Sequence, residues 1–313
     1  MELSVVIPVF NEETDLEETC RKLKSVLEKI KITYEIIFID DGSTDGTFSI
    51  LEKMGKSDKN VRIIKFRRNS GKTAALSAGF EMAEGKIIVT MDGDMQNEPS
   101  DIPMLLKKIN EGYDVVSGWR KNRKDPFISK KVPSIISNWL ASKSTGLKIH
   151  DFNCPLKAYR RECAKDIRLF GEMHRYIPAI AYMNGFRVTE LEVRHYPRKH
   201  GKSKYGFGRL VKGFLDLIYL VFWSSYSTRP FHFFGLISLI EIFLGFLIIF
   251  YKIIIETFVL RMPFITTPAA LLAMVLIISG IQLFVFGFLM EVQIRTYYRD
   301  TKEAYKIEKV INK

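Results

Sequence analysis

Two aspartates separated by one residue are the clearest candidates for chemistry in this chain of 313 residues. Asp92 and Asp94, with Gln96 two positions further on, follow a short apolar run. Carboxylate and amide oxygens are hard ligands, and such a set suits Mg²⁺ or Mn²⁺ bound to a diphosphate. A metal in this position would neutralise charge as a diphosphate leaves. The Asp-x-Asp spacing alone is a weak signal, so its meaning depends on its surroundings.

Three further loops carry polar side chains, and each of them also follows an apolar run. Glu12 follows the first run, Asp40 and Asp41 end the second, and Lys72 comes after the third. A single acidic turn is routine turn chemistry, and Asp41 and Asp45 could simply cap the helix that follows them. Four loops of this kind around one crevice are hard to explain as turns alone.

The apolar runs before these loops have the length and composition of strands that are buried on both faces. Five strands are expected, at residues 3–9, 34–40, 61–66, 86–91 and 114–118. Helical patterns lie between them at 72–83, at 99–111 and from Thr14 to about Ile30, the last opened by a capping box of Thr14 and Glu17. The alternation predicts an α/β fold with a mostly parallel sheet and helices on both sides. Ligands of such sheets bind at the carboxyl ends of the strands, where all four loops lie.

The charge of the chain is strongly positive and unevenly spread. The formal net charge is +12, and the stretches 119–131 and 194–212 are densely basic. Such stretches suit nucleic acid, anionic lipid or a phosphorylated substrate. Nucleic-acid binding would predict interleaved aromatics or a recognised module, and the apolar tail of this chain argues against it. Three cysteines without metal-ligand spacing give no disulfide framework and fit a reducing compartment.

Two segments near the C-terminus have the length of membrane spans. Residues 231–251 contain one charge, Glu241, and residues 267–290 contain none. Each is long enough as a helix to cross a bilayer core, although a buried hairpin of a soluble protein is the alternative. The flanks are more basic than the connecting loop, so both termini and the first domain are expected in the cytoplasm. No basic n-region precedes the first strand, so no cleavable signal peptide is expected.

The region between the first domain and the two apolar segments has the sequence pattern of a helix that lies in the membrane interface. Residues 207–226 are apolar with three charged residues along one side, and aromatic residues could anchor them. We therefore expect a catalytic domain at 1–205, a juxtamembrane region at 206–229, and two spans with a cytoplasmic tail at 230–313.

At these residues the chain resembles the family 2 glycosyltransferases of the GT-A fold. More narrowly, it resembles the polyprenyl-phosphate glycosyltransferases of the dolichyl-phosphate mannose synthase and undecaprenyl-phosphate glucosyltransferase type, over about residues 3–205. The resemblance implies a metal-dependent enzyme that transfers glucose, mannose or an N-acetylhexosamine, with inversion. The donor would be a UDP- or GDP-linked sugar and the acceptor a dolichyl or undecaprenyl phosphate at the cytoplasmic face of the cell membrane. Two membrane spans bury little surface, so a homo-oligomer is also considered.

The resemblance further implies roles for single residues. The nucleotide site would consist of residues at four strand ends, Pro8, Phe10, Glu12, Asp40, Asp41, Lys72, Asp92 and Gly93. The metal would be held by Asp92, Asp94 and Gln96. The acceptor phosphate would be bound by Arg120, Lys130, Lys131 and Ser134. An Arg-x-x-Gly-x-Ser-Lys-Tyr element would close over the donor phosphates with Arg198, Ser203 and Lys204, and Asp94 and Arg198 would be the catalytic residues.

The chain departs from the family pattern at two places. Gly93 and Met95 stand where Ala and Leu are more usual, which is expected to loosen the acidic turn. The site for the lipid phosphate has lysines where an arginine is more typical, and lysine binds as a point charge without bidentate geometry. The segment from Asp151 to Arg160 matches the acceptor side of the family.

The reaction implied by the resemblance requires few catalytic groups from the protein. A phosphate monoester is mostly dianionic at pH 7 and needs no general base. The protein must align the reactants, screen two anions and stabilise the leaving diphosphate. Three alternatives remain: a processive polysaccharide synthase, whose Gln-x-x-Arg-Trp element is absent here, a transferase acting on another glycan or lipid, and a non-catalytic membrane partner that binds nucleotide.

Overall fold

The computed structural model describes residues 1–121, 132–169, 171–197, 208–226, 229–259 and 268–301. The chain divides into two compact units, Met1–Val221 and Phe222–Lys313. Each unit is treated separately below.

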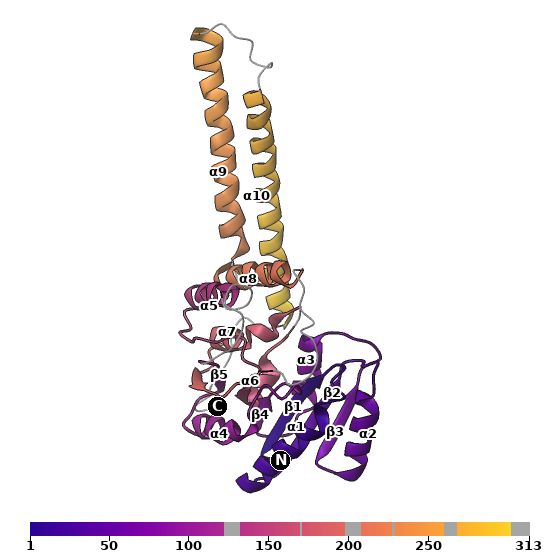
Figure 1. Ribbon diagram of the computed structural model, residues 1–313. Coiled ribbons are helices and arrows are strands. Elements are labelled where there is room, and N and C mark those ends of the chain that lie inside the picture. The colour runs from indigo at the N-terminus through magenta and orange to yellow at the C-terminus, as the bar shows by residue number, and fades with distance from the viewer. Residues whose placement is uncertain (122–131, 170, 198–207, 227–228, 260–267, 302–313) are drawn as a thin grey trace. The chain divides into compact units, whose positions relative to one another are not determined.

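The first unit is built on one seven-stranded sheet in the order β3-β2-β1-β4-β6-β5-β7 (Figure 1). Its strands are β1 (Leu3–Val9), β2 (Tyr34–Asp40), β3 (Val61–Lys65), β4 (Ile87–Thr90), β5 (Val115–Trp119), β6 (Lys157–Arg160) and β7 (Val188–Glu192). Only β6 runs antiparallel to its neighbours, β4 and β5. The predicted α/β class and the five predicted strands are confirmed, whereas β6 and β7 were not predicted.

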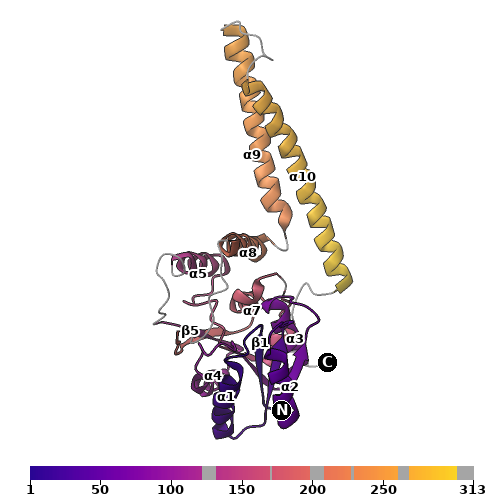
Figure 2. The same ribbon diagram turned by 45° about the vertical axis from the view of Figure 1, so that its right-hand side comes forward.

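Helices cover both faces of this sheet. They are α1 (Leu16–Ile30), α2 (Thr47–Ser57), α3 (Lys72–Met82), α4 (Ile102–Asn110), α6 (Arg161–Asp166) and α7 (Ile177–Met183), with the short 3₁₀ turns η1 (Pro99–Asp101) and η3 (Met173–Arg175). Two further helices, α5 (Val132–Thr145) and α8 (Gly208–Tyr226), pack with each other and with α7, and α8 continues beyond Val221, the last residue of the first unit. Because side chains alternate along a strand, Val5 and Ile7 of β1 pack with α1, α2 and α4, and Val6 packs with α3 and α7. Figure 2 shows β1 between α1 and α3.

The start of α1 differs from the prediction. The helix begins at Leu16, and its N-cap is Asp15, which makes no side-chain capping bond. The predicted capping box of Thr14 and Glu17 is therefore wrong, because it requires the cap to lie one residue earlier.

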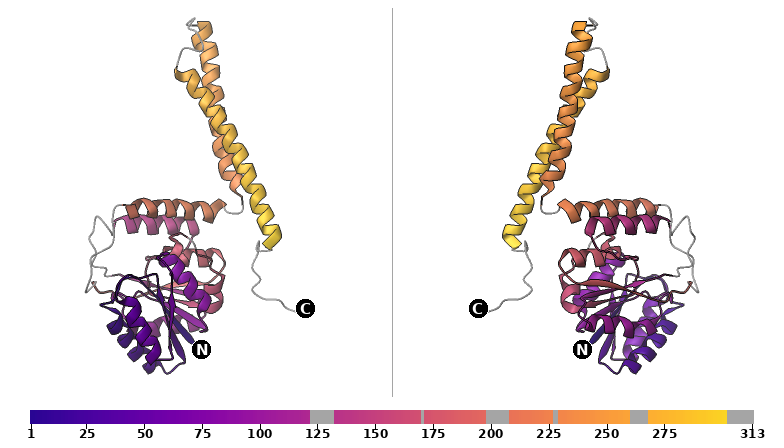
Figure 3. Two further views of the ribbon diagram at one scale, coloured as in Figure 1. Left: turned by 90° about the vertical axis from the view of Figure 1, so that its right-hand side faces the viewer. Right: turned by 90° about the vertical axis from the view of Figure 1, so that its left-hand side faces the viewer.

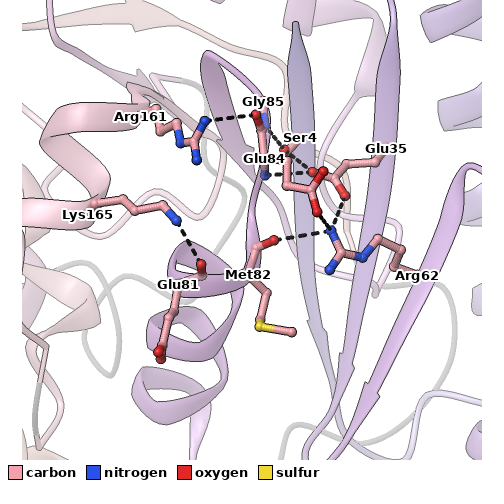
Figure 4. A network of polar contacts seen from close by, with 9 residues as sticks. All are labelled: Ser4, Glu35, Arg62, Glu81, Met82, Glu84, Gly85, Arg161 and Lys165. Carbon is pink, nitrogen blue, oxygen red and sulfur yellow. Dashed lines mark hydrogen bonds and ion pairs between the residues drawn. The ribbon is translucent and has the colours of Figure 1, made fainter. Parts of the chain in front are cut away.

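A buried polar network joins the amino ends of the strands (Figure 4). Ser4 Oγ donates to Glu35 Oε1 at 2.6 Å and accepts from the Gly85 amide at 2.8 Å. Arg62 Nη1 lies 2.8 Å from Glu35 Oε2. The network therefore ties β1, β2, β3 and the end of α3 together at the edge of the sheet opposite the four polar loops.

The second unit contains two long apolar helices, α9 (Pro230–Tyr251) and α10 (Pro268–Thr301), with a π-helical stretch η4 (Lys252–Val259) after α9. The segments Pro230–Ile255 and Pro268–Thr296 are long and apolar enough to cross a membrane. Small residues let the two helices approach closely, since a Cβ on Gly280 would lie 2.9 Å from the Ser238 carbonyl oxygen. The two helices agree with the predicted spans at 231–251 and 267–290, and α10 continues beyond the second.

Candidate functional site

The loops after β1 and β2 are joined by hydrogen bonds. The Asn11 amide donates to Ser43 Oγ at 3.0 Å, and the Thr44 amide donates to Asn11 Oδ1 at 2.9 Å. Asn11 has a φ of 53°, a left-handed conformation that asparagine tolerates better than most residues. Pro8 lies in β1, and Phe10 and the partly buried Glu12 follow it, so all three stand at this edge of the sheet.

The two acids at the end of β2 hold backbone amides. Asp40 is fully buried and accepts from the Ser43 amide at 2.9 Å. Asp41 accepts from the amides of Ser70 and Gly71 at 2.6 and 2.9 Å, so it fixes the loop that precedes α3. Burial raises the pKa of Asp41, and these two hydrogen bonds partly offset the shift.

Neither of the two candidate residues is the N-cap of α2, which is Gly46. Asp45 Oδ1 accepts from the Thr47 amide, at the first residue of α2, at 3.0 Å. Asp41 instead reaches across to the next loop. The turn between them is tightly packed, because Gly42 has a φ of +72° and a Cβ on it would lie 2.5 Å from the Arg68 backbone.

The third and fourth polar loops meet through an ion pair. Lys72 is the first residue of α3, and its Nζ lies 2.5 Å from Asp92 Oδ1. Both side chains are about one-third exposed, so the pair faces the open edge of the sheet. All four strand ends predicted to converge therefore do so.

The acidic turn after β4 is firmly anchored. Thr19 Oγ1 of α1 donates to the Gly93 carbonyl at 3.1 Å, and a Cβ on Gly93 would lie 2.9 Å from Val9 Cγ1. The expectation that Gly93 loosens the turn is therefore not met. Asp94 is buried, and its Oδ1 accepts from the Gln96 amide at 3.2 Å.

The oxygens of this turn fit a divalent cation that is shared with a substrate. Asp92 and Asp94 provide two carboxylates, and the Gln96 side chain adds an amide oxygen while its nitrogen donates to the Tyr196 carbonyl at 3.4 Å. Within the described ranges, no group of three or more His, Cys, Asp and Glu side chains forms a metal site. Mg²⁺ is usually held by one or two carboxylates together with substrate phosphates and water, so the donor set suits it.

Arg120, predicted to bind the acceptor phosphate, is held by a buried carboxylate. Its Nε lies 2.7 Å from Asp151 Oδ2, and its Nη2 lies 3.0 Å from Asp151 Oδ1. Both side chains are more than nine-tenths buried. Such a bidentate pair fixes the orientation of the guanidinium at the end of β5.

Sequence reasoning missed a second cation in this region, Lys157. It begins β6, is 2% exposed, and donates from Nζ to the Cys154 carbonyl. Burial lowers the pKa of Lys157 to about 8. It lines a small cavity that Lys72, Asp92 and His174 also line. A lysine between Leu156 and Ala158, in an otherwise apolar run, was the signal that could have found it.

The structure describes only some of the remaining predicted residues. Ser134 lies in the first turn of α5. Five others lie outside the described residues, namely Lys130, Lys131, Arg198, Ser203 and Lys204. Three cysteines, Cys20, Cys154 and Cys163, are buried and free.

The fold and this site agree with the comparisons with known proteins. The sequence profile named "Glycosyl transferase family 2" matches residues 4–168, and the chain belongs to this family. It is 40% identical to dodecaprenyl-phosphate galacturonate synthase of Rhizobium johnstonii over 304 residues, 96% of this chain and 90% of that protein. It is 34% identical to undecaprenyl-phosphate 4-deoxy-4-formamido-L-arabinose transferase of Proteus mirabilis, covering 99% and 94% of the two chains.

Solved structures support the fold alone. Glucosyl-3-phosphoglycerate synthase from Mycobacterium tuberculosis, in complex with Mn²⁺ and uridine-diphosphate-glucose, superimposes with a TM-score of 0.53. The sequences are 19% identical, and the match covers 71% of this chain and 78% of that chain. The predicted GT-A fold and the predicted family are thus confirmed.

Proposed function

We propose that this protein moves a sugar from a UDP- or GDP-linked donor to a polyprenyl phosphate at the cytoplasmic face of a membrane, with inversion at the anomeric carbon. The observation that carries the proposal is the meeting of an acidic turn and fixed cations at one edge of the sheet, seen in the pairs Lys72–Asp92 and Arg120–Asp151. The relatives support the same class of acceptor, since their names contain dodecaprenyl and undecaprenyl phosphate.

The strand order β2-β1-β4-β6-β5 provides a natural order for the substrates. In this proposal the nucleoside lies over β2 and β1, beside Asp40 and Asp41. The diphosphate lies at the acidic turn after β4. The acceptor phosphate lies near Arg120 at the end of β5. The sugar between the two phosphates then lies over β6, the strand that begins with Lys157.

The reaction forms a bond between an acceptor phosphate oxygen and the anomeric carbon, and breaks the bond from that carbon to the donor diphosphate, which keeps the electron pair. No residue has to remove a proton, because the acceptor is already ionised. The protein aligns the two groups and screens their charges with Lys72, Arg120 and its basic stretches. Mg²⁺ or Mn²⁺, held by Asp92, Asp94 and Gln96, would supply positive charge to the leaving diphosphate.

A polyprenyl acceptor requires contact with a membrane, and two features of the chain support this part of the proposal. The helices α9 and α10 are long and apolar enough to span a bilayer. In the first unit, α5 and α8 run side by side (Figure 3) and share a small core that includes Ala141 and Leu220.

The outer side of this helix pair is apolar. On α5, Ile135 is 60% and Trp139 is 58% exposed, and on α8, Leu215 is 58% and Ile218 is 50% exposed. Such residues are typical of helices that lie in the membrane interface. We therefore propose that the predicted interfacial helix α8 acts together with α5, and that both termini are cytoplasmic as the flanking charges predict.

The proposed function is tested by incubating membranes that contain the full chain with a polyprenyl phosphate, Mg²⁺ or Mn²⁺, and labelled nucleotide-sugars. The panel should include donors of glucose, mannose, N-acetylhexosamines, galacturonate and 4-deoxy-4-formamido-L-arabinose. We expect one donor to label a lipid from which mild acid releases the sugar, and chelator to abolish the labelling. Labelling of a glycan or protein instead of lipid would contradict the acceptor assignment.

A further inference from the structure

The buried ammonium of Lys157 has no carboxylate partner among the described residues. It hydrogen-bonds only the Cys154 carbonyl within that part of the chain, although the residue is 2% exposed. A buried charge is costly unless an opposite charge or several hydrogen bonds compensate for it. A ligand can supply this compensation, so we expect an anionic group of a substrate to bind at Lys157.

Four charged side chains that act on Lys157 or line its cavity are paired with one another. Asp92 pairs with Lys72, and Asp151 pairs with Arg120. The fields of Asp151, Arg120 and Lys72 all act on Lys157, so it lies within reach of both pairs. Among these five side chains two carboxylates face three cations, and Lys157 carries the surplus positive charge. The carboxylate of Asp94, in the same turn as Asp92, bonds the Gln96 amide and belongs to the proposed metal site.

The register of β6 places this surplus charge between the two proposed phosphate sites. Lys157 is paired with Thr90 of β4 and with Ser117 of β5. Thr90 comes two residues before Asp92, and Ser117 comes three residues before Arg120. If the donor diphosphate lies at the first and the acceptor phosphate at the second, the group that lies over Lys157 is the transferred sugar. This step rests on the proposed function.

We propose that Lys157 binds an anionic substituent of the transferred sugar, so that the donor is a nucleoside diphosphate linked to a uronic acid. A sugar carboxylate would accept a charge-assisted hydrogen bond from the ammonium and neutralise the surplus charge. The donor diphosphate and the acceptor phosphate have cations of their own at the acidic turn and at Arg120. Asn153 and His174 line the same small cavity, so polar side chains lie beside Lys157.

Binding and transfer should be measured with the full chain in lipid nanodiscs, using UDP-galacturonate and UDP-glucuronate against UDP-galactose and UDP-glucose. Lys157→Met removes the charge at similar length, and Lys157→Arg keeps it. Lys165→Met is the matched control, because Lys165 is exposed and bonds only the Glu81 carbonyl among the described residues. UDP alone serves as the probe for an intact nucleotide site.

We expect the wild type to prefer the uronates about tenfold or more, which is the size of one charge-assisted hydrogen bond. Lys157→Met should weaken uronate binding by about 10- to 100-fold, mostly in KM, and change binding of neutral donors and UDP less than about threefold. Lys157→Arg should retain part of the preference. The melting temperature of Lys157→Met should be unchanged or higher, because a buried charge is removed.

An equal loss for uronates and neutral donors would overturn the proposal and assign Lys157 to a phosphate. A wild type that prefers neutral sugars would overturn it too. If Lys157→Met loses UDP binding and melts early, Lys157 is structural and the proposal also fails. A wild type that labels no lipid with any donor would instead refute the proposed function, whatever the variants bind.

Discussion

Lys72 and Asp92 form an ion pair of 2.5 Å between the start of α3 and the acidic turn after β4. The two residues are 20 positions apart in sequence, and the pair joins their loops. Together with the bonds from Asp41 to the amides of Ser70 and Gly71, it links the second, third and fourth polar loops into one rigid edge. Preorganised groups of this kind cost little reorganisation when charge develops during a reaction.

Lys72→Met tests whether this pair serves function more than stability. The two side chains are about one-third exposed, and such a pair contributes only about 0–1 kcal/mol to the free energy of unfolding. We expect a small change in melting temperature and a loss of transfer activity of about tenfold or more, since in the proposed site the cation also faces the diphosphate. A large fall in melting temperature, with activity lost in proportion, would contradict this assignment.

Asp94→Asn should reduce transfer by about 100- to 1000-fold, because an amide is a poor ligand for a hard divalent cation. The folded structure should persist, since the amide oxygen can still accept from the Gln96 backbone. Asp58→Asn is a suitable control, because Asp58 pairs with Lys24 at 2.6 Å, away from the polar loops. Normal Mn²⁺-dependent activity in Asp94→Asn would rule out the proposed metal ligand.

Variants of the Arg120–Asp151 pair should separate its effect on stability from its effect on transfer activity. Arg120→Met removes the bidentate guanidinium from the buried Asp151 carboxylate and should cost about 3–5 kcal/mol of unfolding free energy. The double variant Arg120→Met/Asp151→Leu should recover most of that stability, because neither charge of the pair remains buried. Its activity should stay low if Arg120 also binds the acceptor phosphate. Recovered activity would show that Arg120 acts only through the fold.

The network around Glu35 predicts a sensitivity to acid. Burial by itself raises the pKa of Glu35, but hydrogen bonds from Ser4, Glu84 and Arg62 bring it below its usual value. A lowered folded-state pKa means that the stabilisation is complete above the unfolded pKa of about 4.3 and is lost as the pH falls through the folded value. Glu35→Gln should therefore lower the unfolding free energy at pH 7 by about 1–3 kcal/mol and flatten its dependence on pH below 5.

Urea unfolding of the two proteins between pH 3 and pH 7 would check this prediction. Glu52→Gln is the matched control, since Glu52 and its partner Lys56 are both more than half exposed. Equal pH profiles for wild type and Glu35→Gln would contradict it.

The apolar surface of α5 and α8 predicts membrane binding that does not depend on the nucleotide site. Trp139→Ser and Leu215→Ser should slow transfer to a membrane-bound acceptor and leave UDP binding unchanged, because both side chains are exposed. Protection of Trp139 from aqueous fluorescence quenchers, in nanodiscs against detergent, measures its contact with lipid directly. Equal quenching in the two environments would place this surface in water.

Much of the fold follows from local patterns in the sequence. Four of the five strands that were predicted are runs such as Val5 to Val9, mostly buried on both faces. The fifth, β3, is an edge strand and is only partly buried. The missed strands lack that pattern. β6 is only Lys157–Arg160 with a charge at each end, and β7 is a short, partly exposed strand with two glutamates at the edge of the sheet.

The site residues that follow strand ends could be predicted from the sequence. Those that are brought together by contacts between distant parts of the chain could not. Asp92, Asp94 and Lys72 could be placed because parallel strands bring their loops to one edge. The Arg120–Asp151 pair joins residues 31 positions apart through the antiparallel strand β6, and no local signal reveals it. The burial of Lys157 depends on the same strand. These residues therefore required the structure.

The mass of the lipid product tests the proposed sugar transfer to a lipid phosphate most directly. The full chain in nanodiscs should be given a polyprenyl phosphate, Mg²⁺ or Mn²⁺ and the preferred nucleotide-sugar, with Asp94→Asn alongside. The account predicts a lipid that has gained one sugar residue and still carries one phosphate, and its absence in the variant. A lipid that carries two phosphates, or a sugar found only on a non-phosphorylated acceptor, would contradict transfer to the lipid phosphate.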